Sequence, residues 1–142
     1  MPEQPLIDAA HAYIEAFNGA DWDRFEAALT ADSVYDEVGT GRRAEGHEAI
    51  LELFKGWKHT MPDAMGTVTS ALASEGEVAI EVTWSGTMTG SWGDSPATGK
   101  PQKTRAALFL RFSGEAISEV RQYFDSLALL QQLGMMPEPG SP

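Results

Sequence analysis

Residues 115–134, EAISEVRQYFDSLALLQQLG, read as a strand that leads directly into a short apolar helix. Successive strand side chains point to opposite sides of a sheet, which places five residues, most of them chargeable, on one face: Ile117, Glu119, Arg121, Tyr123 and Asp125. Leucines then recur at helical spacing, and Gly134 stands where a helix end favours a left-handed residue. The pattern predicts that an acid, Asp125, joins the last strand to the last helix.

Length and composition limit what surrounds this junction. The 142 residues suit one domain with a single core. The net charge of −11 disfavours nucleic acid and anionic membrane surfaces as partners, because both need clustered Lys and Arg. The chain has no cysteine, which excludes disulfides, thiolate catalysis and thiolate metal sites. It shows no secretory signal and no apolar run of the roughly 20 residues that a membrane span needs, so we expect a cytoplasmic protein.

The first half of the chain has helical periodicity. Apolar residues recur every three or four positions from Leu6 to the helix-ending Asn18-Gly19, again from Trp22 to Leu29, and from His47 to Met61 before Pro62. A short strand is predicted over 33–38, and a charged, glycine-containing loop over 39–46. Three helices are therefore expected ahead of most of the sheet.

Beyond Pro62 the period changes from 3.6 to 2. Strands are predicted over 68–73, over 78–84 with a possible extension to Trp92, over 104–112, and over the run that ends at Asp125, with a turn-rich loop over 93–101. The order of elements predicts an α+β fold, with a curved antiparallel or mixed sheet wrapped around the three helices and an internal apolar pocket. We expect a lead-in over 1–5, one domain over 6–134 and a disordered tail over 135–142.

The order of several short motifs resembles the SnoaL-like polyketide cyclase group, which shares its fold with nuclear transport factor 2 and ketosteroid isomerase. The motifs are AYIEAFNGAD (12–21), ADSVY (31–35), GHEAI (46–50), GTMTG (86–90) with PATGKP (96–101), and RQYFD (121–125) with LQQLG (130–134). The resemblance covers about residues 6–134. Each motif alone is weak; their order is informative for the family and says little about an activity.

The resemblance implies a cone-shaped barrel, a homodimer formed through the outer sheet face, and catalysis without metal or organic cofactor. In such cyclases an acid on the last strand acts as base in an intramolecular aldol closure, and Asp125 matches that position. Two positions depart from the cyclase pattern: Leu108 replaces a histidine, and Leu53 replaces a polar helix residue. On the second sheet face, Phe109, Val120 and Phe124 would need cover, which agrees with a dimer.

Asp125 has two interpretations. As a general base in a dry pocket it would need a pKa raised by burial, and positioned proton transfer contributes about 10²- to 10⁴-fold. As an N-cap of the last helix it would add about 1 kcal/mol of stability. Tyr123 is the candidate oxyanion donor, while Arg121 and Glu119 fit a solvated ion pair.

Aromatic and apolar residues are the candidates for binding a hydrophobic small molecule: Phe17, Tyr35, Trp57, Trp84 and Leu108. Each also fits an ordinary core position. His11, His47 and His59 have no metal-site spacing, so we expect no metal.

Three functions remain open at this stage. The first is a cofactor-independent proton-transfer enzyme of the cyclase or isomerase type that acts on a hydrophobic carbonyl compound. The second is a non-catalytic binder of hydrophobic small molecules, which Leu108 favours. The third is an epoxide hydrolase, in which Asp125 would grip a water molecule together with Tyr35 or Glu81.

Overall fold

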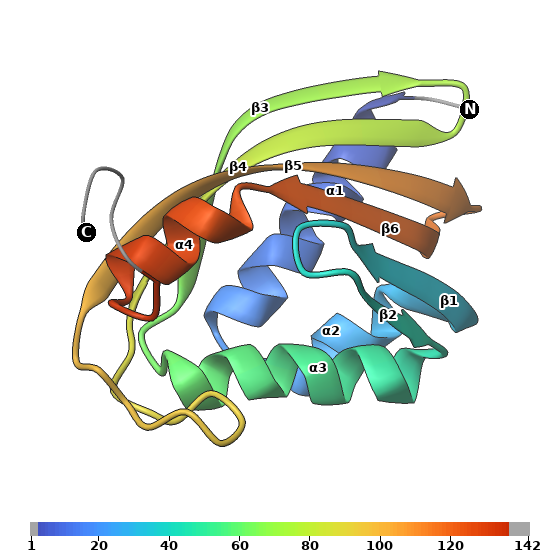
Figure 1. The fold of residues 1–142 in the computed structure, drawn as a ribbon. Helices are drawn as coiled ribbons and strands as arrows, with labels where there is room; N and C mark the ends of the chain where they lie inside the picture. Colours follow the sequence, from blue (N-terminus) through green and yellow to red (C-terminus); the bar gives the residue numbers. More distant parts are fainter. Residues whose placement is uncertain (1–2, 137–142) are drawn as a thin grey trace.

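The computed structural model describes residues 3–136 and shows the α+β fold expected from the sequence (Figure 1). Four helices are present in this part of the chain: α1 (Glu3–Asn18), α2 (Trp22–Ala27), α3 (His47–Thr60) and α4 (Ser126–Gln132). The strands are β1 (Leu29–Glu37), β2 (Arg42–Glu45), β3 (Met65–Ser74), β4 (Glu77–Thr87), β5 (Pro101–Ser113) and β6 (Ala116–Phe124). The predicted tail lies outside the described residues from position 137 onward.

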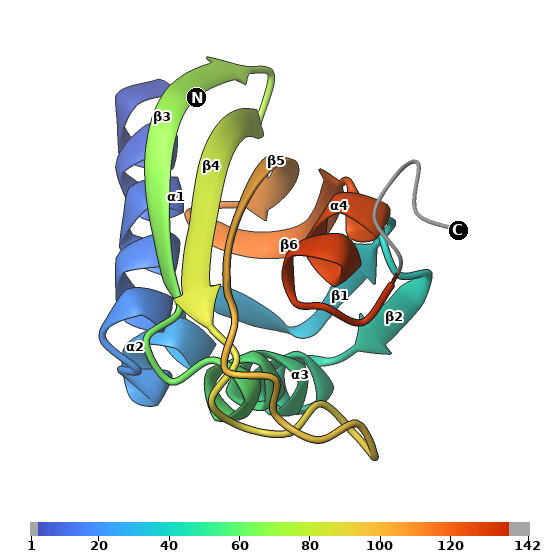
Figure 2. The same cartoon turned by 60° about the vertical axis from the view of Figure 1, so that its left-hand side comes forward.

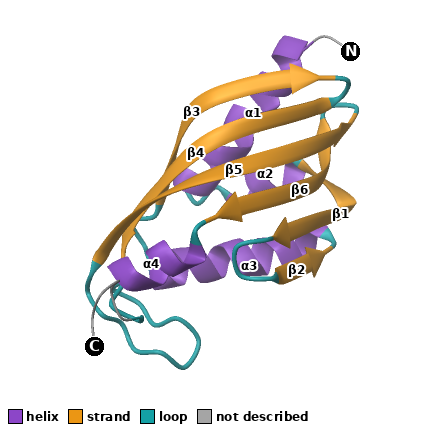
Figure 3. Cartoon of the chain, turned by 45° about the horizontal axis from the view of Figure 1, so that its top comes forward, coloured by secondary structure: helices purple, strands orange, loops and turns teal. Residues whose placement is uncertain are grey.

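The strands form one curled sheet in the order β2-β1-β6-β5-β4-β3 (Figure 3). All neighbours are antiparallel except β1 and β6, which run parallel, so the sheet is mixed. The sheet does not close, because β2 and β3 remain as its edges. The parallel pair brings the ends of β1 and β6 to the same edge of the fold, with Glu37 beside Gln122.

The three N-terminal helices pack on the concave side of the sheet (Figures 1 and 2). Helix α1 contacts β3 and β4, and α3 contacts β1 and β2 across the open side. Helix α4 returns to pack on β5. No helix in residues 3–136 is both long enough and apolar enough to cross a membrane.

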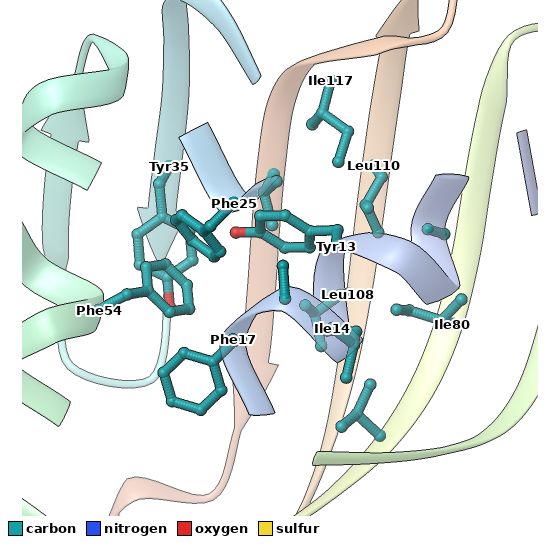
Figure 4. Close-up of a cluster of buried hydrophobic side chains, with 14 of the residues drawn as sticks. Tyr13, Ile14, Phe17, Phe25, Tyr35, Phe54, Ile80, Leu108, Leu110 and Ile117 are labelled. Carbon is teal, nitrogen blue, oxygen red and sulfur yellow. The ribbon is translucent and has the colours of Figure 1, made fainter. Parts of the chain in front are cut away.

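The core lies between the helices and the concave face (Figure 4). Aromatic rings of the helices contact one another and a ring of β1: Tyr13 stacks on Phe25 at 4.8 Å between centroids, and Phe54 contacts Tyr35 of β1 at 4.9 Å. Aliphatic side chains from β4, β5 and β6 fill the other side, among them Ile80, Leu108, Leu110 and Ile117. Such ring pairs contribute beyond the apolar area that they bury.

Two local predictions are wrong. Strand β1 begins at Leu29, where a helix end was expected, because this backbone pairs with Ile117 of β6. The predicted loop over 39–46 contains β2, a short edge strand of charged residues that pairs with β1. Charged edge strands lack the apolar alternation on which the prediction relied, and such charges discourage edge-to-edge association.

The two faces of β6 also differ from the prediction. Val120 and Gln122 are buried and Phe124 is half-buried, so this face points inward and does not need cover from a second chain. Arg121 and Tyr123 point outward instead, where Arg121 pairs with Glu77. The backbone register shifts opposite Arg111 and Phe112, and this irregularity reverses the alternation that holds beside Ile117.

Candidate functional site

A small cavity lies where the inward faces of the sheet meet α1, α3 and α4. It offers about 50 Å³ to the centres of water-sized molecules. Its walls come mainly from aromatic, aliphatic and amide side chains: Phe17, Glu37, Phe54, Trp57, Met61, Ala64, Trp84, Ser85, Gln102, Thr104, Gln122, Phe124 and Leu129. Among these residues Glu37 is the one with an ionisable side chain. We call this space the inner cavity.

The Glu37 carboxylate is fully buried and is held by four side chains. Oε2 accepts from Tyr35 Oη at 2.7 Å and from Trp57 Nε1 at 3.0 Å. Oε1 accepts from Thr40 Oγ1 at 2.6 Å and from Arg42, whose Nε and terminal nitrogen lie 2.9 and 2.7 Å away. Burying a carboxylate is costly unless it is paired and hydrogen-bonded, and here both conditions are met. The negative charge is therefore fixed beside the cavity.

A chain of hydrogen bonds along the cavity wall ends at this carboxylate, and each group in it donates to the next. Trp84 Nε1 can only donate, and it donates to Gln122 Oε1 at 2.6 Å, which fixes the orientation of the amide. Gln122 Nε2 then donates to Tyr35 Oη at 2.6 Å, and Tyr35 gives its own proton to Glu37. These bonds use one of the two N–H groups of Gln122. The second is a candidate donor to a ligand, since Gln122 lines the cavity.

The Tyr35 hydroxyl acts as a neutral relay in this chain. Burial raises its pKa well above the ordinary value of 10.0, and the neighbouring Glu37 charge raises it further. The phenol therefore stays protonated at physiological pH, so it donates to Glu37 at the same time as it accepts from Gln122.

A second polar group links α4 to the cavity. Gln132 Oε1 accepts from the backbone N–H of Lys103 at 2.8 Å, and its amide nitrogen lies 3.5 Å from Thr104 Oγ1. Thr104 in turn donates to Gln102 Oε1 at 2.7 Å. Helix α4, which places Leu129 in the cavity wall, is thus tied to β5 by polar contacts.

The structure brings three predicted binding residues together. Phe17, Trp57 and Trp84 line the inner cavity. Tyr35 is fully buried and reaches the site through its hydroxyl group. The side chain of Leu108 is fully buried in the core and is not part of the cavity wall. The residue that pairs with Leu108 on β6 is Gln122. The polar group that points into the fold beside Leu108 is therefore an amide.

The structure places Asp125 and Tyr123 outside the inner cavity. Asp125 is exposed, and its side chain accepts from the backbone N–H of Ala128 at 3.0 Å, which makes it the N-cap of α4. Tyr123 is 43 % exposed and packs against Phe109 on the outer face of the sheet. Neither residue lines the inner cavity.

Neither of the two pairs expected for an epoxide hydrolase, Asp125 with Tyr35 or Asp125 with Glu81, is part of the inner cavity wall. Glu81 lies on the outer face, where its side chain is 58 % exposed and 3.9 Å from Arg105. Tyr35 is buried on the opposite side of the sheet. A carboxylate near Tyr35 exists nevertheless, and it is Glu37.

Glu37 and Gln122 were not identified from the sequence. A signal for Glu37 was present, because it lies two residues beyond Tyr35 on the strand that was predicted there and so shares its face. Gln122 had no such signal once β6 was assigned to the opposite face. In residues 3–136 no group of three or more His, Cys, Asp or Glu side chains is arranged to hold a metal ion.

Comparison with known proteins identifies the family. The model of the SnoaL-like polyketide cyclases matches residues 7–133. The chain belongs to the SnoaL-like polyketide cyclase family. No protein with a curated description matches the sequence.

Solved structures of the same fold accompany this family match. A protein with a ketosteroid isomerase-like fold from Catenulispora acidiphila, in complex with trimethylamine, is 23% identical, with a TM-score of 0.79 over 94% of this chain and 97% of that chain. IdmH from Streptomyces antibioticus, a proposed polyketide cyclase, is 25% identical, with a TM-score of 0.80 over 92% and 99%. An LEH-like epoxide hydrolase from M. tuberculosis is 21% identical, with a TM-score of 0.75 over 92% and 90%.

Proposed function

We propose that this member of the SnoaL-like family is a cofactor-independent proton-transfer enzyme that acts on a neutral, hydrophobic carbonyl compound. The proposal rests above all on the chain of hydrogen bonds that runs from Trp84 through Gln122 and Tyr35 to Glu37. Trp84, Gln122 and Glu37 all line the mainly apolar inner cavity. Oriented amide groups and buried carboxylates are the parts that such catalysis uses. The similarity to IdmH agrees with a cyclase-type reaction.

Gln122 supplies the oxyanion donor in this proposal. Its second N–H group donates to the carbonyl oxygen, on which negative charge develops as an enolate forms. The bond from Trp84 to Gln122 Oε1 strengthens this donor, because it draws electron density toward the amide oxygen. The fixed amide needs no reorganisation during the reaction.

Glu37 is the proposed base, in place of Asp125. It removes a proton from the carbon next to the carbonyl group and returns it after ring closure or isomerisation. Its hydrogen-bond donors and Arg42 hold the carboxylate in place. Carboxylates in general are weak bases. The substrate must therefore carry an acidic C–H group, such as the carbon between two carbonyl groups in a β-dicarbonyl compound.

Hydrogen–deuterium exchange tests this function without the natural substrate. The probe is a 2-alkyl-β-keto ester in deuterated buffer, followed by NMR at its C2 proton. We expect saturable acceleration by the native protein, a loss of about 10²-fold in Gln122→Leu, as for removal of one oxyanion donor, and no change in Asp125→Asn.

Two outcomes would overturn the proposal. Loss of exchange in Asp125→Asn with retention in Gln122→Leu would return the base to the end of β6. Binding of the ester without any acceleration would support the alternative of a non-catalytic binding protein. Circular dichroism of each variant checks that the fold is intact.

A further inference from the structure

A second hollow lies on the other side of one wall of the inner cavity. It is an open surface depression of about 410 Å³, formed by the β1–β2 turn, the loop between β4 and β5, and α4. Its lining combines small, hydroxyl and apolar side chains: Gly39, Thr40, Trp92, Ser95, Ser126, Leu130 and Met135. We call this space the outer hollow. It is much larger than the inner cavity.

The wall between the two spaces consists of packed side chains and is one side chain thick where Phe124 meets Gly39. The rings of Trp57 in the inner wall and Trp92 in the outer wall lie 4.9 Å apart. The Phe124 ring of the inner wall lies directly against Gly39, where an added Cβ would come within 2.8 Å of the ring. Adjacent residues of α4 complete the wall, with Leu129 facing inward and Leu130 facing outward.

A hydrogen bond also connects the two sides of the wall. Thr40 lines the outer hollow, and its hydroxyl group donates to the Glu37 carboxylate of the inner cavity at 2.6 Å. Glu37, the proposed base, is therefore hydrogen-bonded to a residue that lines the outer hollow.

We propose that the outer hollow is a second subsite, which holds the remainder of a two-part substrate whose carbonyl end occupies the inner cavity. The inner cavity has room for only a few non-hydrogen atoms, whereas ligand pockets usually measure about 300–1,000 Å³. A substrate that displaces part of this wall, such as the Phe124 ring, would reach both volumes, and this inference rests on the proposed function for the position of the carbonyl end.

The lining of the outer hollow defines the chemical class of this remainder. None of the described residues that form it has an ionisable side chain, and hydroxyl groups of Thr40, Ser95 and Ser126 alternate with apolar surface. The occupant is thus an uncharged chain or ring system that carries a few hydroxyl or carbonyl oxygens. The lining residues themselves offer no cation to a phosphate-bearing carrier.

Tryptophan side-chain NMR signals separate the two subsites. The chain has four tryptophans. Trp57 and Trp84 line the inner cavity, Trp92 lines the outer hollow, and Trp22 lines neither. Methyl ethyl ketone and methyl octyl ketone are titrated into ¹⁵N-labelled protein. The short ketone is expected to move the indole signals of Trp57 and Trp84, and the long ketone that of Trp92 in addition.

Affinity should rise about three- to fourfold for each methylene group that enters the outer hollow. Leu130→Asp, and separately Ser95→Phe, should abolish this gain and the shift of Trp92 while the short ketone still binds. Leu127→Asp is the matched control, because Leu127 lies on α4, is 50 % exposed and lines neither space. It should leave both ketones unaffected.

Failure of this inference is distinct from failure of the proposed function. If the long ketone binds no better than the short one, or leaves the Trp92 signal unmoved, the outer subsite is refuted while the role of Gln122 stands. If Gln122→Leu leaves the binding of the short ketone unchanged, the proposed position of the carbonyl end is refuted instead.

Discussion

Two carboxylates stand at neighbouring strand ends and have opposite surroundings. Glu37 is the last residue of β1, and Asp125 follows the last residue of β6, the strand that runs parallel to β1. Glu37 is fully buried and is held by four side chains, whereas Asp125 is exposed and caps a helix through one backbone N–H group. The comparison teaches that the direction in which a side chain leaves the sheet decides whether an acid reaches the cavity.

The largest effect is expected from Glu37→Gln. The variant leaves Arg42 without its partner and turns one carboxylate oxygen into an amide that cannot accept from its former donors. Breaking a buried pair by changing one partner costs about 3–5 kcal/mol, and this range is an upper limit here because Arg42 is partly exposed. Urea denaturation measures the change in the free energy of unfolding.

Asp125→Asn is the matched control for this experiment, since it makes the same chemical change at the exposed acid. A loss of stability in Asp125→Asn as large as that in Glu37→Gln would show that the two acids contribute equally to stability despite their different burial. So would a Glu37→Gln variant as stable as the native protein.

Tyr35→Phe should have the next largest effect. It removes the hydroxyl group that donates to Glu37 and accepts from Gln122, and so leaves two buried groups with one bond fewer. Each buried group left without its partner costs about 1–3 kcal/mol, and we expect a total loss near the lower end because Glu37 keeps its other donors. Thermal unfolding at neutral pH gives the value. An unchanged melting temperature would show that the chain does not hold the site together.

The same substitution should alter stability at high pH. Burial raises the pKa of both Tyr35 and Tyr13, so the folded protein keeps these protons while the unfolded chain releases them above about pH 10. Their contribution is complete below that pH and falls as pH rises above it, by about 1.4 kcal/mol per pH unit for each tyrosine. Tyr35→Phe should therefore reduce the loss of stability by about 1.4 kcal/mol per pH unit, as measured by urea denaturation at several alkaline pH values. An unaltered slope would place the titrating group elsewhere.

The helices and the central strands followed from the sequence, because their apolar residues repeat with periods that only one backbone geometry satisfies. The sequence also predicted correctly that Asp125 joins the last strand to the last helix. The direction of the Asp125 side chain was predicted wrongly, because one register shift beside Phe112 reverses the alternation of β6. No residue type in the sequence indicates that shift. Gln122 was missed for this reason. Glu37 was missed although it shares a strand face with Tyr35, a residue that was identified as a candidate.

Asp125→Ala should have a smaller effect, confined to α4. Loss of an N-cap side chain costs about 1 kcal/mol, and Asp125 accepts the N–H of Ala128. Helix α4 also supplies Leu129 to the inner cavity and Leu130 to the outer hollow, so a frayed helix would loosen the wall between them. Hydrogen exchange of the α4 amides should accelerate in Asp125→Ala while that of the β6 amides stays unchanged.

Asp125→Asn should have the smallest effect of the series, because asparagine caps helices about as well as aspartate. Its stability should lie within a few tenths of a kcal/mol of the native value, and its α4 amides should exchange at the native rate. Together the two variants separate a capping role from a catalytic one, since a cap is lost in alanine and kept in asparagine, whereas a base is lost in both. Equal loss of proton-transfer activity in alanine and asparagine variants that retain a stable α4 would make Asp125 a base despite its exposure, and the contrast with Glu37 would then not hold.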